Sequence, residues 1–295
     1  MILNISGRTD VVAFYSKWLI KRLEEGFFDV RNPFYHSLVN RIYLKDVSLL
    51  VFCTKNPLPI IPYLDKINKP IYFFVTLTSY NKDIEPNVID KKLVIEGIKE
   101  ISKKIGKNNV ILRYDPILIN DKYTISYHIK AFDKLLSSLN GYINEVIVSF
   151  IDDYKNVRKN EDTLKYKKEL TEEEYEKIGL NFSEIARKYN MTVKTCGEVR
   201  TLWEYGFIPG DCLSKEKAYE LTGEKYPIWA ERRNKNCHCV KMIDVGAYNS
   251  CPHLCKYCYA NFSEEEVTLN YHNHFDDSTM LIGGLEDNDI IKGSW

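Results

Sequence analysis

Three cysteines near the C-terminal end have a spacing suited to an iron–sulfur cluster. Cys251, Cys255 and Cys258 follow the pattern C-x3-C-x2-C. Three thiolates from one loop can bind three irons of a cubane [4Fe–4S] cluster, and the fourth iron then has no protein ligand. A metal position without a protein ligand is open to a small molecule, which distinguishes reactive metal sites from structural ones. The spacing therefore predicts a reactive cluster, and a structural metal clip is the alternative.

Four of the other cysteines are enough to form a second metal site. They are Cys196, Cys212, Cys237 and Cys239. Four thiolates can hold either a fully ligated [4Fe–4S] cluster or a tetrahedral zinc ion. We expect a second cluster, which would relay electrons or bind substrate, and zinc is the alternative because it accepts the same ligands. Cys53 lies in an apolar run and is expected to be a small buried hydrophobic residue.

Charged and hydroxyl-bearing residues follow most of the predicted strands. Reactive groups in a parallel barrel lie at the carboxyl ends of the strands. Arg113 and Asp115 lie on either side of a tyrosine at the end of an apolar run, so both should face the barrel mouth. Helix capping or a salt bridge would explain such residues singly, whereas their convergence favours a site. The predicted substrate-facing residues are Lys55, Arg113, Asp115, Asp152 and Glu198.

The elements that must position these residues alternate between strands and helices. Apolar runs rich in β-branched and aromatic residues predict strands in a parallel sheet that is buried on both faces. The predicted strands are 2–6, 47–54, 70–78, 109–115, 145–152, 191–196 and 241–248. Helical patterns lie between them at 88–106, 124–141 and 171–190. This alternation predicts an α/β fold, a partial or complete parallel βα barrel.

The chain divides into three predicted parts. Residues 1–200 contain the βα barrel units, and 201–240 form a cysteine-bearing insertion with no obvious strand. A short basic run, "ERRNK", lies within this insertion at 231–235. Residues 241–295 contain the last strand, the C-x3-C-x2-C loop and a helix that should begin at Ser263, because Ser263 and Glu266 form a capping-box pattern.

Composition limits the class of protein. The 295 residues are 44% hydrophobic, which suits a large core, and 41 basic residues balance 41 acidic ones. A nucleic-acid partner is therefore conceivable but is not supported by charge, since such proteins usually carry a basic excess. No signal-peptide pattern and no long apolar stretch is visible, so we expect a cytoplasmic protein with no membrane segment. Clustered cysteines in a reducing compartment favour metal binding over disulfides.

The cysteine loop resembles the cluster motif of the radical S-adenosylmethionine enzymes. The resemblance rests on Cys251, Cys255 and Cys258, with the aromatic Tyr257 directly before the last cysteine. It implies that the amine and carboxylate of S-adenosylmethionine chelate the open iron, and that Tyr257 lies near the adenine. It also implies that one electron, from a donor such as a ferredoxin or flavodoxin, cleaves S-adenosylmethionine to a 5′-deoxyadenosyl radical that abstracts hydrogen from a substrate.

The position of the motif differs from that in most of these enzymes, where it follows the first barrel strand. Here it follows the last predicted strand, which a circular permutation would explain if 241–248 lay beside 2–6. The loop "SGRTD" would then neighbour the cluster. On this hypothesis Arg8 binds the carboxylate of S-adenosylmethionine and Asp10 its amine, and Ser6 and Gly7 belong to the same cofactor-binding loop.

Further stretches resemble one family over nearly the full length. "SGRTD", "RNPF", "TKNP", "DIEP", "RYDPI" and "DVGAYNSCPHLCKYCYAN" are similar to the family catalogued as domain of unknown function 1848. That family resembles the spore photoproduct lyase branch of radical S-adenosylmethionine proteins, which implies a scaffold and cofactors but no reaction. The alternatives are a zinc-stabilised barrel that binds nucleic acid or protein, and a metal-dependent hydrolase, against which the strand ends supply no histidine.

Overall fold

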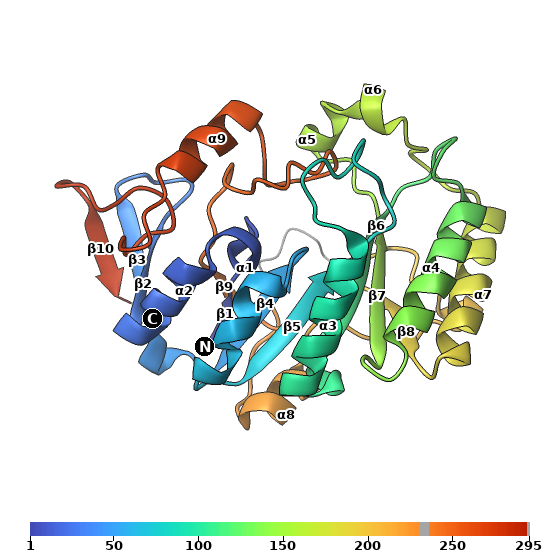
Figure 1. The fold of residues 1–295 in the computed structure, drawn as a ribbon, viewed down its shortest axis with the longest axis horizontal. Coiled ribbons are helices and arrows are strands. Elements are labelled where there is room, and N and C mark those ends of the chain that lie inside the picture. Colours follow the sequence, from blue (N-terminus) through green and yellow to red (C-terminus); the bar gives the residue numbers. More distant parts are fainter. Residues whose placement is uncertain (230–235, 294–295) are drawn as a thin grey trace.

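The computed structural model describes residues 1–229 and 236–293, and its centre is a seven-stranded parallel sheet (Figure 1). The order of the strands is β8-β7-β6-β5-β4-β1-β9. They are β1 (Ile2–Asn4), β4 (Leu49–Thr54), β5 (Ile71–Thr76), β6 (Val110–Ile117), β7 (Glu145–Phe150), β8 (Thr192–Thr195) and β9 (Ile243–Asp244). All seven predicted strands therefore form, and all are parallel to their neighbours.

The first and last strands of the sheet in the sequence are neighbours in space. β1 pairs with β9, with Leu3 opposite Ile243 and Asn4 opposite Asp244. The loop that follows β1 and the loop that follows β9 consequently leave the same edge of the sheet, as the sequence predicted. In the part of the chain that the structure describes, β8 and β9 are edge strands that do not pair with each other, so the hydrogen-bonded ladder is open.

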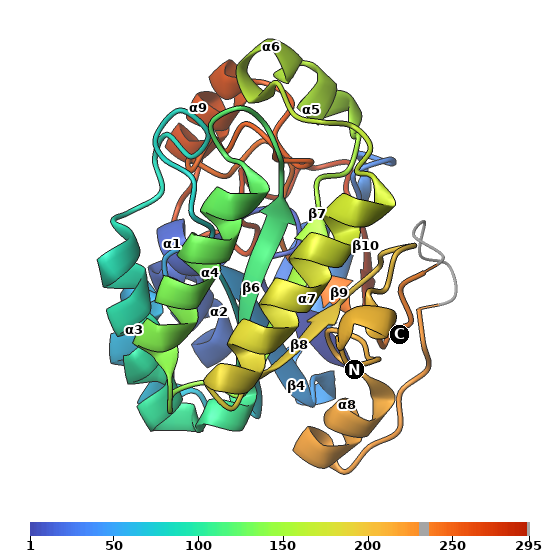
Figure 2. The same cartoon turned by 90° about the vertical axis from the view of Figure 1, so that its right-hand side faces the viewer.

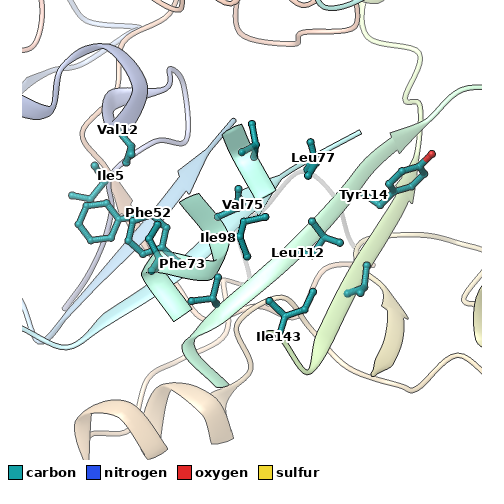
Figure 3. Packing of buried hydrophobic residues seen from close by; sticks show 14 of the residues in the cluster. Ile5, Val12, Phe52, Phe73, Val75, Leu77, Ile98, Leu112, Tyr114 and Ile143 are labelled. Carbon is teal, nitrogen blue, oxygen red and sulfur yellow. The ribbon is translucent and has the colours of Figure 1, made fainter. Parts of the chain in front are cut away.

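One face of the sheet is covered by helices and contains the largest apolar core. Leu50, Phe52, Phe73 and Leu112 point toward this face, as Figure 3 shows for the last three. The covering helices are α1 (Val11–Phe14), α2 (Ser16–Glu25), α3 (Lys91–Ile105), α4 (Ile125–Leu139) and α7 (Glu172–Lys188), together with the 3-10 helix Leu58–Lys66. Figure 2 shows α4 and α7 side by side over β6–β8. The three long helices predicted from the sequence are α3, α4 and α7.

The other face of the sheet packs against the segment that carries Cys212, Cys237 and Cys239, and we call it the cysteine face. Residues that alternate with those of the first face, such as Val51 and Phe74, contribute to this second core. The helix α8 (Lys215–Thr222) adds Ala218 to it. Because both faces are covered, the strands are apolar almost throughout, which is typical of parallel sheets.

A second, three-stranded sheet was not predicted from the sequence. It consists of β2 (Phe27–Arg31), β3 (Leu38–Tyr43) and β10 (Ile290–Gly293), in the order β10-β3-β2. β2 and β3 form an antiparallel hairpin, and β10 pairs with β3 in parallel. The C-terminal strand is therefore hydrogen-bonded to a hairpin from the beginning of the chain.

The remaining helices lie together at one end of the molecule. Figures 1 and 2 both show α5 (Lys155–Arg158), α6 (Glu161–Leu164) and α9 (Glu264–His272) at the end opposite α8. Ser263 caps α9 by accepting a hydrogen bond from the backbone N–H of Glu266, as predicted. The predicted basic run 231–235 lies outside the described residues. Among the helices that the structure describes, none is both long and apolar enough to span a bilayer.

Candidate metal centres

Four cysteines from separate parts of the chain meet on the cysteine face. The Sγ atoms of Cys196, Cys212 and Cys239 all lie within 4.8 Å of one another, and those of Cys196 and Cys239 are 3.9 Å apart. Cys237 contacts both Cys196 and Cys239. All four residues are described by the structure, and none is in a disulfide. Cys196, Cys212 and Cys239 form a possible metal site, and Cys237, the fourth residue that the sequence grouped with them, contacts two of the three but is not within 4.8 Å of all of them.

Local backbone contacts bring these cysteines together. Cys196 directly follows β8, and Cys212 lies shortly before α8, whose N-terminus is capped by the Ser214 side chain. The stretch that carries Cys239 runs beside both: the backbone N–H of Val240 donates to the carbonyl of Leu213 at 3.1 Å. The site thus ties the end of one edge strand, β8, to the segment that leads into the other, β9.

Several of these thiols can be ionised together only if positive charge lies near them. Contacts with Cys196, Cys212 and Cys237 lower the pKa of Cys239, whereas contact with Cys196 raises the pKa of Cys237. One thiolate is therefore stabilised by its neighbours, and further thiolates need positive charge. Arg113 supplies some of it: burial lowers the pKa of Arg113, but Asp115, Cys212 and Cys196 raise it by more, so the guanidinium stays charged.

The C-x3-C-x2-C loop directly follows β9 and is held by its neighbours on both sides. Two of its turns need the left-handed conformation, at Asn249 (φ 51°) and Leu254 (φ 54°). Asn249 also fixes the loop, because its side-chain oxygen accepts the backbone N–H of Phe262 and its amide donates to Glu266. The side chain of Asn261 donates to the carbonyl of Cys251 at 2.8 Å. The conformation of the loop is therefore fixed by hydrogen bonds to the first turn of α9 and to the residues just before it.

The three thiols of this loop are more widely spaced than those of Cys196, Cys212 and Cys239. They do not form a group whose sulfur atoms all lie within 4.8 Å, a condition that Cys196, Cys212 and Cys239 satisfy among the described residues. Burial raises the pKa of each thiol, that of Cys255 to about 12, so cationic metal is needed to hold all three as thiolates. The charge of Lys55 opposes this rise at Cys255 and at Cys258.

Asp10 and His253 clamp the loop to the sheet. His253, between the first two cysteines of the motif, has its Nε2 2.9 Å from a carboxylate oxygen of Asp10. The same oxygen accepts the hydroxyl of Thr54 at 3.0 Å and the backbone N–H of Lys55 at 2.7 Å. The other oxygen caps α1 through the N–H of Ala13. Asp10 therefore joins the loops after β1, β4 and β9, and its proposed contact with a methionyl amine stays a prediction.

A buried carboxylate, Glu85, organises the opposite side of the loop. It accepts Lys55 Nζ at 2.8 Å, and it also contacts Lys91, the Thr78 hydroxyl and the Tyr257 hydroxyl. Burial alone would raise the pKa of Glu85, but the two lysines lower it by more, so the group is an anion. Lys55 also lies 5.4 Å from the centre of the Tyr257 ring. Glu85 thus fixes both the predicted adenine-side tyrosine and the lysine beside Cys255.

The loop "SGRTD" is anchored to the end of β9 by Asp244. One oxygen of Asp244 accepts the N–H of Gly7 at 2.7 Å, and the other accepts Arg8 Nε at 2.5 Å. A Cβ at Gly7 would lie 2.8 Å from Asp244, so only glycine allows this approach. Ser6 is buried and accepts the N–H of Val11 at 3.2 Å. Arg8 lines a cavity of about 690 Å³ between this region and the second sheet.

The other predicted substrate-facing residues come from three neighbouring strands: Arg113 and Asp115 lie within β6, whereas Asp152 and Glu198 follow β7 and β8. Arg113 pairs with Asp115, whose carboxylate also accepts the Ser149 hydroxyl. Asp152 and Glu198 line an open cavity of about 530 Å³. Burial raises the pKa of Glu198 to about 7, a hydrogen bond from Phe150 N–H opposes the rise, and the nearby carboxylates of Asp152 and Asp115 add to it.

This cavity is close to the C-x3-C-x2-C loop. Tyr154, which lines the cavity, has its ring 5.8 Å from that of Tyr259, the residue after the last cysteine of the motif. The side-chain amide of Asn156 donates to the carbonyls of Tyr259 and Asn261 at 2.8 and 3.0 Å. The segment after β7 therefore connects the cavity with the candidate cluster loop.

The structure thus separates the predicted residues into three groups. Arg8 and Gly7 contact Asp244, with Ser6 in the same loop, and Lys55 and Tyr257 contact Glu85. In the third group Asp152 and Glu198 line the cavity, whereas Arg113, paired with Asp115 within β6, lies near Cys196 and Cys212. Sequence reasoning missed Asp244 and Glu85 as organising residues. Asp244 lies inside the predicted strand 241–248 and Glu85 lies between predicted elements, so no local pattern marks either residue.

The fold and the cysteine site define an α/β protein with a possible metal centre. The family model described as Domain of unknown function (DUF1848) matches residues 2–260, so the chain belongs to this family. This confirms the family resemblance seen in the sequence. The comparison with curated proteins gave no match.

Proposed function

We propose that this protein is a radical S-adenosylmethionine enzyme whose [4Fe–4S] cluster is held by Cys251, Cys255 and Cys258. The observation that carries the proposal is a loop with three thiols and no fourth cysteine, located where β9 ends beside β1. The donor set fits the cluster, because thiolates are its usual ligands and three of them leave one iron open. When bound, the cluster supplies the electron that cleaves S-adenosylmethionine to a radical able to take hydrogen from the substrate.

The residues around the loop would bind and orient these groups. Lys55 places positive charge beside Cys255, which offsets the negative charge of a thiolate-ligated cluster. Glu85 holds the hydroxyl of Tyr257, so the ring of Tyr257 has a fixed orientation toward a bound adenine. Arg8 would bind the carboxylate of S-adenosylmethionine, and its contact with Asp244 fixes its position. Asp10 holds the loop through His253, and its role toward the amine is part of the same proposal.

The same proposal includes a circularly permuted partial barrel. The pairing of β9 with β1 supports it, because it places the cluster loop and the "SGRTD" loop on adjacent strands although they lie at opposite ends of the sequence. The last strand in this chain would then correspond to the first barrel strand of other radical S-adenosylmethionine proteins.

The substrate would bind at the carboxyl ends of β6–β8. The cavity of about 530 Å³ there contains Asp152 and Glu198 and is connected with the cluster loop through Tyr154 and Tyr259. A Glu198 carboxyl with a pKa of about 7 can hold or release a proton at neutral pH. Such a site suits a substrate whose polar groups exchange hydrogen bonds with carboxyl groups. The electron would come from a ferredoxin or flavodoxin in the cytoplasm.

Anaerobic purification followed by spectroscopy tests the proposal. We expect a brown protein with broad absorbance near 400 nm that yields 5′-deoxyadenosine from S-adenosylmethionine and dithionite. The triple variant Cys251→Ser, Cys255→Ser, Cys258→Ser should lose this cluster and the cleavage, whereas Cys53→Ser is the matched control and should keep both. A protein that binds no iron under these conditions but holds zinc at the three loop cysteines would instead favour the zinc-stabilised binding module.

A further inference from the structure

We infer that Cys196, Cys212, Cys237 and Cys239 bind one tetrahedral metal ion, zinc, rather than a second [4Fe–4S] cluster. This inference concerns a different site from the proposed radical chemistry and does not rest on it. It favours the alternative that the sequence left open for these four cysteines.

The distances between the sulfur atoms distinguish the two kinds of centre. A zinc ion with Zn–S bonds of about 2.3 Å in a tetrahedron places its sulfur ligands roughly 3.8 Å apart. A cubane cluster places an iron and its bond between each sulfur ligand and the centre, so the cysteine sulfur atoms lie about 6 Å apart. Cys196 Sγ and Cys239 Sγ are 3.9 Å apart, and Cys212 Sγ lies within 4.8 Å of both. These three sulfur atoms are too close together to surround a cubane, and Cys237, which contacts Cys196 and Cys239, is the fourth ligand nearest to them although it is not within 4.8 Å of all three.

A disulfide between two of these cysteines does not fit either. A disulfide requires sulfur atoms about 2 Å apart, and none of these cysteines is so joined. The C-x3-C-x2-C loop is an internal comparison, because its sulfur atoms do not all lie within 4.8 Å of one another. Three of the four cysteines of the proposed zinc site therefore lie closer together than the three loop cysteines do, which is the direction that separates a single ion from a cluster.

The surroundings of these four cysteines suit a structural metal ion whose ligands all come from the protein. Cys212, Cys237 and Cys239 are buried within the core of the cysteine face, next to Leu213 and Val240. A four-thiolate zinc site carries two negative charges, and the Arg113 guanidinium is attracted to the thiolates of Cys212 and Cys196. Zinc ranks above the more abundant iron in affinity for such ligands. Four protein ligands leave no position for a substrate, so this ion would hold the stretches around Cys212 and Cys239 on the sheet rather than react.

The test separates the two sites by variants. The triple serine variant at 251, 255 and 258 should retain about one zinc per chain and lack both iron and acid-labile sulfide. The double variant Cys212→Ser, Cys239→Ser should lose zinc and keep about four irons. Cys53→Ser should change neither metal content.

Reconstitution tests whether zinc only replaced a cluster at these four cysteines during expression. The triple variant, stripped of metal under reducing conditions and supplied with ferrous iron and sulfide without zinc, should take up one metal and no inorganic sulfide. Zinc-edge X-ray absorption of the wild-type protein should show four sulfur neighbours at about 2.3 Å, which does not depend on any variant folding. Incorporation of about four irons and four sulfides into the triple variant would overturn the inference while leaving the proposed function intact. Zinc without iron in the wild-type protein would support the inference and contradict the proposed function.

Discussion

Replacing Glu85 by glutamine removes one negative charge from a buried cluster and leaves its size unchanged. The Glu85 residue is 1% exposed, and its carboxylate pairs with Lys55 and Lys91, whose side chains are 13% and 33% exposed. Removing one partner of a buried ion pair costs about 3–5 kcal/mol, because the remaining charge is left without compensation. Lys91 recovers part of its hydration because it is partly exposed, so we expect Glu85→Gln to destabilise the fold by about 3 kcal/mol.

Anaerobic thermal unfolding of the metal-loaded protein measures this effect. In a chain of this size, 3 kcal/mol corresponds to a fall in Tm of about 6 °C. The matched control is Glu96→Gln, which breaks an exposed pair with Lys99 on α3 and should change Tm by less than about 1 °C. The double variant Glu85→Gln, Lys55→Met should be more stable than Glu85→Gln alone, because it removes the more deeply buried of the two lysine charges that Glu85 compensates. Equal Tm values for Glu85→Gln and Glu96→Gln would show that Glu85 is not the buried anion described above.

Two further changes test the residues at the strand ends. Arg8→Ala should weaken S-adenosylmethionine binding about tenfold in anaerobic titrations without loss of iron, since one charge-assisted contact is removed, whereas Arg158→Ala, in an exposed pair with Asp153, should leave binding unchanged; unaltered affinity in Arg8→Ala would refute the role of Arg8. Glu198→Gln should change how stability depends on pH: the raised pKa of Glu198 means that the folded state holds a proton that the unfolded state has released between about pH 4.5 and 7, so wild-type stability falls as pH rises through this range. The Tm of the variant should therefore gain on that of the wild type between about pH 5 and pH 8.5, by the equivalent of at most about 3 kcal/mol, and parallel curves would contradict the assignment.

The main sheet was predictable because its strands carry a strong local signal. Runs such as 47–54 and 70–78 are almost wholly apolar, as strands covered on both faces must be. The pairing of β9 with β1 followed from the position of the cysteine motif. The convergence of Cys196, Cys212, Cys237 and Cys239 was predictable from their number, but the spacing of their sulfur atoms was not, because it depends on how the segment after β8 folds back.

The second sheet and the buried anions could not be read from the sequence. β2 contains Asp29 and Arg31, so it lacks the apolar run of a buried strand, and an ion pair joins Arg31 to Asp289, far along the chain. Asp29 is buried only because Arg41 of the neighbouring strand pairs with it. Glu85 reads as an ordinary loop carboxylate until the lysines at 55 and 91 meet it. In each case the partner lies on another element, which local patterns do not reveal.

The attachment of β10 to β3 has a consequence for how the chain is made. The family match ends at residue 260, yet Trp18 Nε1 donates to the carbonyl of Ser278, and the N–H of Asp29 donates to that of Thr279. Until residues 290–293 have been synthesised, the edge of the β2–β3 hairpin that β10 covers has its hydrogen-bonding groups exposed. Such an edge can recruit strands from other nascent chains. A chain that ends at residue 260 would leave this edge of β3 unpaired, and we expect the shortened protein to aggregate.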